Sequence, residues 1–150
     1  MNKIAKINQQ HEQAMQLAED AFFAKRSKEE VKANKLYKEA FQLEMEAALA
    51  LVSEYENEPT RSVLFKGAAT LALECEQELE AERMIRYALL GHPPKQIKQE
   101  LYELLEEIQI KRAILSPLDK YQQLPQNLQK EVVDFIDFLL MKHYEVKTSI

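Results

Sequence analysis

The chain has 150 residues, 46% of them hydrophobic and 30% charged, and its formal net charge is −5 at pH 7. This composition is typical of a folded globular protein and excludes an intrinsically disordered chain. The negative charge argues against binding to nucleic acid through the phosphates, which requires an excess of Lys and Arg.

Cysteine content and hydropathy exclude further classes of protein. Cys75 is the single cysteine, which excludes a disulfide framework and a thiolate metal site. The longest apolar run, 47–52, is far shorter than a membrane span, and residues 1–13 lack the apolar core of a signal peptide. We therefore expect a cytoplasmic protein that does not enter a membrane.

Hydrophobic periodicity predicts an all-α fold. The chain has only two glycines and lacks the alternating apolar pattern of strands. Ser27 followed by Glu30 indicates a capping box, Thr60 an N-cap and Gly91 a left-handed C-terminal turn, while Ser116-Pro117 should end a helix. The predicted helices cover about 3–25, 28–55, 61–76, 78–90, 95–112 and 126–143.

Small residues recur on the third and fourth of these helices at helical spacing. Because small side chains let two helix backbones approach closely, we expect the helices to form a tight antiparallel hairpin. The residues concerned are Ala68, Ala69 and Ala72 on the first helix of the hairpin, with Ala81, Ile85 and Ala88 on the second.

The stretch from Phe65 to Pro93 resembles a tetratricopeptide repeat (TPR). Phe65 occupies the position of the family's bulky aromatic residue, Ala69 that of its small residue, and the later positions are matched by Ala81, Ile85, Ala88 and Pro93. The first hairpin matches through Ala33, Tyr37 and Ala40, so the resemblance covers about residues 14–93. It implies stacked antiparallel hairpins of solenoid type.

The resemblance also implies a protein-interaction module whose groove is lined by the first helix of each pair. At the matching positions, Lys66 and Thr70 would face this groove and bind the partner. A run of lysines and one arginine has the spacing of an ordinary solvated helix face, which we favour; the alternative is a patch for an acidic partner. The run consists of Lys25, Arg26, Lys28, Lys32, Lys35 and Lys38.

The last predicted helix resembles a motif of small bacterial antitoxin-like proteins. The match covers about residues 121–143 and includes Leu124-Pro125, Glu131-Val132 and the run 134–139. It suggests a component of a toxin–antitoxin or related system. The breaks before this helix predict a boundary between a TPR-like domain, 1–112, and a hinged C-terminal segment, 113–150.

The apolar face of this last helix is wider than one neighbouring helix covers. We expect it either to cap the hairpins or to dock on another protein or on a second copy, which would make a homodimer. Phe138 and Met141 would then contribute to binding.

These features favour a non-catalytic protein-interaction scaffold without metal or cofactor. The alternative is a small helical ribonuclease. Arg86 and His92 have the spacing of the Arg-His motif of HEPN-type ribonucleases, in which the His moves a proton and the Arg supports the phosphate charge.

Overall fold

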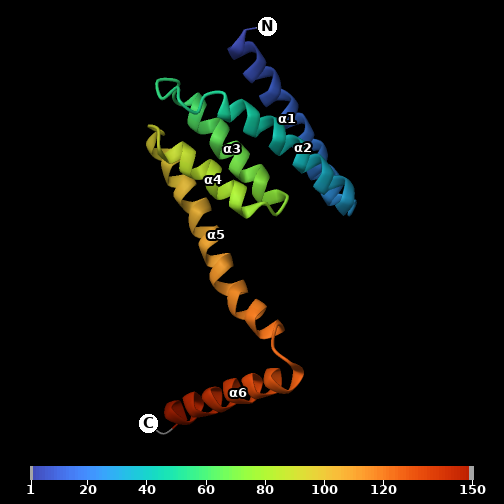
Figure 1. The fold of residues 1–150 in the computed structure, drawn as a ribbon, viewed down its shortest axis with the longest axis vertical. Helices are drawn as coiled ribbons and strands as arrows, with labels where there is room; N and C mark the ends of the chain where they lie inside the picture. The colour runs from blue at the N-terminus through green and yellow to red at the C-terminus, as the bar shows by residue number, and fades with distance from the viewer. Residues whose placement is uncertain (1, 149–150) are drawn as a thin grey trace. The chain divides into compact units, whose positions relative to one another are not determined.

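The computed structural model describes residues 2–148, and each regular element in that part is an α-helix (Figure 1). The all-α prediction is confirmed. The chain divides into two compact units, Met1–Ile108 (unit 1) and Gln109–Ile150 (unit 2). The helices are α1 (Lys3–Arg26), α2 (Glu30–Leu49), α3 (Thr60–Glu74), α4 (Glu78–Leu89), α5 (Lys95–Gln122) and α6 (Gln126–Thr148).

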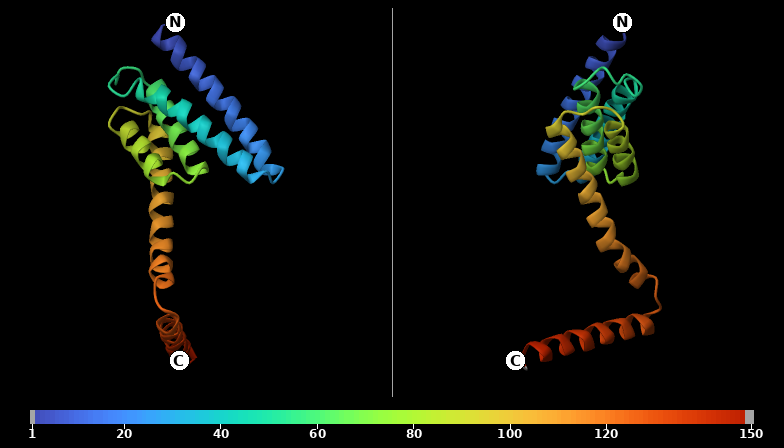
Figure 2. Two further views of the ribbon diagram at one scale, coloured as in Figure 1. Left: turned by 45° about the vertical axis from the view of Figure 1, so that its right-hand side comes forward. Right: turned by 90° about the vertical axis from the view of Figure 1, so that its left-hand side faces the viewer.

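Unit 1 consists of two antiparallel hairpins followed by the first part of α5. Helices α1 and α2 form one hairpin and α3 and α4 the other, and α2 packs against α3 (Figure 2). The core joins all five helices, since it extends from Ile7 on α1 to Leu101 and Ile108 on α5.

The predicted contact between α3 and α4, formed by five alanines and Ile85 and called the alanine seam below, is buried as expected. Each of its six residues is fully enclosed, with no exposed surface: Ala68, Ala69, Ala72, Ala81, Ile85 and Ala88. The same spacing of alanines recurs in the first hairpin 48 positions earlier, where Ala21, Ala33 and Ala40 are also buried. Both hairpins therefore bring their helices together through small side chains at equivalent positions.

The turns inside the two hairpins are also equivalent. Lys28 and Glu76, again 48 positions apart, both have a left-handed backbone, with φ of 61° and 59°. The following amides close the same six-residue turn, because Glu29 N donates to Ala24 O at 2.9 Å and Gln77 N donates to Ala72 O at 2.8 Å. This is the Schellman pattern of helix C-termini, formed here without glycine.

Two predicted N-caps are wrong. Ser27 is the C-cap of α1 rather than the N-cap of α2, which begins after Glu29 without a capping side chain. The Schellman turn explains this, because it places two further residues between the helices. Thr60 is the first residue of α3, and Pro59 occupies the N-cap position.

Three predicted helix ends also need correction. Helix α2 ends at Leu49 rather than near Tyr55, and tighter turns follow, in which Leu51 N donates to Ala48 O. Helix α5 continues through Pro117, since a proline removes only one amide donor and the neighbouring turns can remain helical. Helix α6 extends to Thr148 rather than His143, and residues 149–150 lie outside the described part of the chain.

A buried arginine joins the two hairpins. Arg61, at the start of α3, has no exposed surface. Its Nη2 donates to Val52 O at 3.0 Å, after the end of α2, and to Tyr87 O at 2.8 Å, near the end of α4. Its Nε donates to Val52 O at 3.2 Å, and its guanidinium carbon lies 5.0 Å from the centre of the Phe65 ring. One side chain thus donates hydrogen bonds to backbone carbonyls at the C-terminal ends of both α2 and α4.

Gly91 has a different role from the one predicted. Its backbone is not left-handed, so the predicted glycine turn is wrong. A Cβ at this position would lie 2.4 Å from Nη1 of Arg61, closer than side chains pack. Gly91 is therefore required to leave room for the guanidinium group.

We expect Arg61→Met to lower the free energy of unfolding by about 3–5 kcal/mol, because it leaves buried carbonyls without donors and removes the cation beside Glu58. Urea denaturation followed by circular dichroism measures the change. Arg86→Met is the matched control: its side chain is 65% exposed and pairs with Glu82 one turn earlier on the same helix, so the loss should stay below about 1 kcal/mol. Equal losses in both variants would contradict the role of Arg61.

We expect Ala69→Leu to destabilise unit 1 by about 1–3 kcal/mol, since the enclosed seam has no room for three further carbon atoms. The neighbouring Thr70 is exposed, so Thr70→Leu should change stability by less than about 0.5 kcal/mol. Thermal melts of both variants test this. An unchanged melting temperature for Ala69→Leu would show that the seam is not tightly packed.

Candidate functional site

A buried carboxylate lies under the surface that α1 and α3 share. Glu44 belongs to α2 and has no exposed surface, and both of its carboxylate oxygens lie 3.0 Å from Nδ1 of His11 on α1. With an ionised Glu44, Nδ1 carries the hydrogen and donates to it. The opposite edge of the ring, with Nε2, is then available to a ligand, because the His11 side chain is 38% exposed.

A glycine on α3 makes room for this carboxylate. A Cβ at Gly67 would lie 2.6 Å from Oε1 of Glu44. Burial raises the pKa of the Glu44 carboxyl above its ordinary value, and the hydrogen bond and charge of His11 oppose that rise. Three helices thus fix one imidazole: α1 supplies it, α2 orients it and α3 leaves the space.

The imidazole borders a small pocket of about 160 Å³ between α1 and the start of α3. Its walls are mainly apolar, and its polar groups are the ring of His11, the amide of Asn8 and the hydroxyl of Thr60. Such a pocket suits one apolar side chain whose adjoining backbone hydrogen-bonds to the polar rim. The lining residues are Ile7, Asn8, His11, Pro59, Thr60, Val63 and Leu64.

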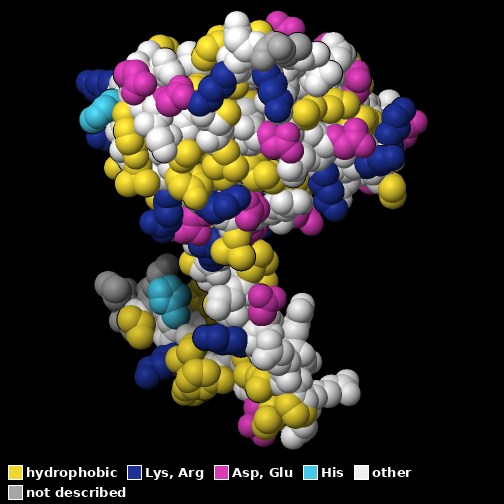
Figure 3. Space-filling model, turned by 45° about the horizontal axis from the view of Figure 1, so that its top comes forward, with side chains coloured by type: hydrophobic (Ala, Val, Ile, Leu, Met, Phe, Trp, Pro, Cys, Tyr) yellow, Lys and Arg dark blue, Asp and Glu magenta, His cyan; other side chains and the backbone are white. Residues whose placement is uncertain are grey.

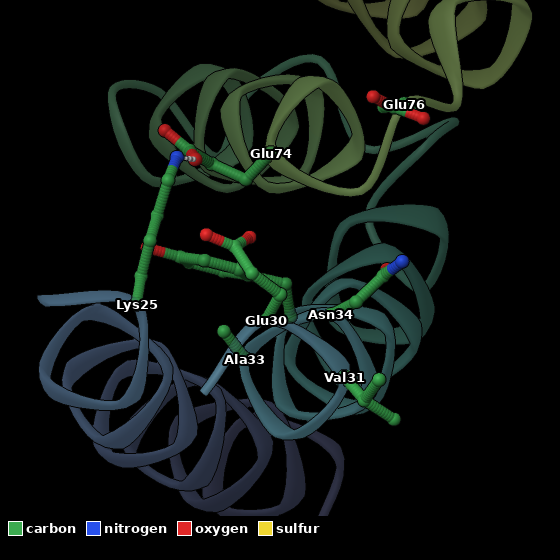
Figure 4. A pocket seen from close by; sticks show the side chains of 8 residues that line it. Lys25, Glu30, Val31, Ala33, Asn34, Glu74 and Glu76 are labelled. Atoms are coloured by element: carbon green, nitrogen blue, oxygen red, sulfur yellow. Dashed lines mark hydrogen bonds and ion pairs between the residues drawn. The ribbon is translucent and has the colours of Figure 1, made fainter. Parts of the chain in front are cut away.

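A larger and more polar pocket, of about 410 Å³, lies between the two hairpin turns (Figure 4). In Figure 4, Glu30 extends from α2 toward Glu74, whose carboxylate accepts a hydrogen bond from Lys25 Nζ at 3.3 Å. That bond is the main reason why the pKa of Lys25 is raised, whereas burial is the main reason for the raised pKa of Tyr37. Because Lys25 is already paired, the remaining carboxylates of Glu30 and Glu76 give this pocket a negative balance.

Neither predicted groove residue presents a free polar group to a partner. Lys66 forms an ion pair with Glu100 on α5, and its side chain is 35% exposed. Thr70 is exposed, but its hydroxyl donates to the carbonyl of Lys66 at 3.0 Å. The ion pair does show that α3 lies beside α5, as the small pocket shows that it lies beside α1. Helix α3 therefore has both α1 and the first part of α5 as neighbours.

The residues of the ribonuclease alternative lie near the end of α4. Arg86 pairs with Glu82 at 2.6 Å, and His92 is exposed after the helix has ended. In unit 2, Phe138 and Met141 are 56% and 63% exposed on α6.

The charged surface is mixed. The six residues of the basic run are all exposed, as expected for a solvated face, and basic and acidic side chains alternate over unit 1 (Figure 3). Among the described residues, no helix is long and apolar enough to cross a bilayer, and no three His, Cys, Asp or Glu side chains are grouped to hold a metal ion.

The sequence patterns did not reveal two residues of this candidate site. Glu44 and His11 read as surface residues of amphipathic helices, yet Glu44 lies on the same helix face as the buried Ala40 and Ala47. A carboxylate in an apolar seam is a signal of a buried polar contact.

Comparison of the chain with protein-family models, curated proteins and solved structures finds no match.

The raised pKa of Glu44 predicts how stability varies with pH. A raised pKa means that the folded protein holds this proton more tightly than the unfolded chain, so the stabilisation is present below the ordinary value of 4.5 and is lost as pH rises through the raised pKa. Glu44→Gln keeps an oxygen that accepts from Nδ1 and cannot lose a proton. We expect the stability of this variant relative to the wild type to increase between about pH 4 and pH 7.

Urea denaturation at several pH values measures this difference in the free energy of unfolding. Glu39→Gln, an exposed change on the same helix, is the control for the loss of one carboxylate at the surface. A pH-independent difference for Glu44→Gln would show that Glu44 does not titrate as a buried group.

Proposed function

We propose that this protein is a non-catalytic protein-interaction scaffold with TPR-like hairpins, and that the face of α1 and α3 binds a segment of a partner protein. The repeated hairpin is the observation that supports this most directly. Buried alanines and left-handed turn residues recur 48 positions apart in two hairpins of different sequence. Hairpins that stack in this way create an extended face from the first helix of each pair.

The pocket between α1 and α3 indicates the kind of segment that this face would bind. The exposed part of Val63, 43% of the residue, adds apolar surface beside the pocket, and His11 and Asn8 provide polar groups at its edge. An extended or helical peptide with one apolar anchor side chain fits these features. Since Lys66 is paired, we assign the anchoring to His11 and Val63 rather than to Lys66 and Thr70.

The resemblance of residues 121–143 to antitoxin-like proteins supports a place in a bacterial toxin–antitoxin or related system. In such a system the scaffold face of unit 1 would hold a protein partner. Polar groups fixed by buried side chains suit this role, because they need no rearrangement when the partner binds.

We test the proposal by selecting peptides from a displayed library on the full-length protein and measuring their affinity by fluorescence anisotropy. Val63→Lys should weaken the selected peptides at least about tenfold, since it places an unpaired charge beside an apolar anchor. Val31→Lys is the matched control, because Val31 is an 87%-exposed valine on α2 that borders the other pocket.

The two variants separate the two surfaces. Loss of binding in Val63→Lys with retention in Val31→Lys supports the α1–α3 face. The reverse result would assign binding to the pocket between the hairpin turns and overturn the proposed face. Failure to select any peptide that depends on either residue would overturn the scaffold function of unit 1.

A further inference from the structure

Unit 2 has no core of its own. None of its described side chains is buried, and α6 leaves a series of large apolar residues more than one third exposed (Figure 3). The exposed apolar residues of α6 include Leu128, Val133, Phe135, Ile136, Phe138, Leu139, Leu140, Met141, Tyr144 and Val146. A set this large on one helix marks an interaction surface.

Part of this surface follows the spacing of a coiled-coil seam. Residues recur at alternating intervals of four and three along α6, which places them in one stripe on the helix. The stripe is apolar except for Lys142. It consists of Leu128, Val132, Phe135, Leu139, Lys142 and Val146.

The residues beside the stripe are both charged and apolar. Glu131, Phe138 and Glu145 lie along one edge, and Gln129, Ile136 and His143 lie along the other. The midpoint between Glu131 and Lys142 and the midpoint between Phe135 and Leu139 both fall near position 137. A helix with this arrangement is complementary to itself when a second copy runs in the opposite direction.

We propose that α6 forms a homodimer by pairing antiparallel with α6 of a second copy of this chain. Phe138 then faces Phe138 of the second copy across the twofold axis, and Phe135 packs against Leu139. Lys142 enters the layer of Val132 of the second copy, where Glu131 is next to it. Phe135 and Leu139 form the centre of the contact, and two equivalent ion pairs lie between this centre and the outer layers of Leu128 and Val146.

The charges decide the direction of pairing. In a parallel pair, each seam residue faces its own equivalent, so Lys142 would face Lys142 of the second copy in an apolar contact, which is unfavourable. The antiparallel arrangement brings each Lys142 to a carboxylate instead. A lysine in the seam thus excludes the parallel dimer and stabilises the antiparallel one.

The same symmetry favours a second copy over a different protein. A foreign partner would need apolar residues opposite the stripe, but nothing would then require Glu131 and Lys142 to lie six and five residues from its centre on opposite sides. This inference goes beyond the proposed function, because it concerns α6 in unit 2 and not the face of α1 and α3.

Charge exchange in the full-length protein tests the proposal. Sedimentation velocity at about 1–100 µM should show a dimer. Glu131→Lys and Lys142→Glu should each raise the dissociation constant of the dimer at least about tenfold, because each places like charges in contact. The double variant, Glu131→Lys with Lys142→Glu, should restore the dimer, since the ion pairs are re-formed with the charges exchanged.

Asp134→Lys is the matched control, because Asp134 is an exposed acid of the same helix that lies away from the stripe. This variant should dimerise like the wild type. Circular dichroism of every variant shows whether the helices remain folded.

Cross-linking tests the direction of the helices. In a Cys75→Ser background, Phe138→Cys should be joined efficiently to its equivalent by a short bifunctional thiol reagent. Leu128→Cys should not be joined, because nine residues separate it from the centre and the two copies lie about 27 Å apart along the helix axis.

Three outcomes would overturn the proposal. If the full-length protein is monomeric at about 100 µM, α6 does not pair with a second copy, and its apolar stripe is covered by its own chain or by a different protein. A dimer that is indifferent to both single charge changes forms through another surface. Efficient cross-linking at Leu128→Cys with none at Phe138→Cys means that the helices pair in parallel.

Discussion

The guanidinium group of Arg61 is the interaction on which the arrangement of unit 1 depends most. It is fully buried, and its main hydrogen-bond acceptors are the backbone carbonyls of Val52, Tyr87 and Ala88. Carbonyls at helix C-termini carry a partial negative charge, so they compensate a buried cation without a fully buried counter-ion. The ends of the two hairpins must stay where this one side chain can reach them.

The other buried charged side chain of unit 1 also has a partner within the chain. Glu44 has His11 as its partner, and Gly67 has no Cβ to occupy the space of the carboxylate. Gly91 has the corresponding position beside Arg61. Each of the two glycines of the chain thus leaves space for one of the two buried charged side chains. Because the alanine seams fix the helices at short separations, a Cβ at either glycine could not be accommodated by moving a helix away.

Periodicity was sufficient to predict the all-α fold and the buried alanines, because both depend on the spacing of apolar residues. It could not predict the two buried charges. Glu44 and Arg61 are residue types that belong at the surface unless the fold brings a partner to them. Those partners are His11 for Glu44 and the carbonyls of Val52 and Tyr87 for Arg61. The same reasoning explains the candidate site, since His11 gains its importance from Glu44 and the predicted Lys66 is paired with Glu100.

Errors at helix ends had a local cause. Lys28 and Glu76 have left-handed backbones, which are expected of glycine and so left no signal in the sequence. The end of α2 near Leu49 is coupled to Arg61, which takes the carbonyl of Val52. Pro117 was a clear breaker signal, yet α5 continues past it, because a proline affects one turn of a long helix.

The two units differ in where their stability originates. Unit 1 encloses a continuous core and provides partners for its main buried charges within the chain. Unit 2 has long helical segments but none of its described side chains is buried, and helices in proteins owe most of their stability to the packing of an apolar face. Its helices therefore gain most of their stability from whatever covers their apolar faces. A change in the occupancy of that surface would alter the folding of unit 2 while unit 1 remained intact.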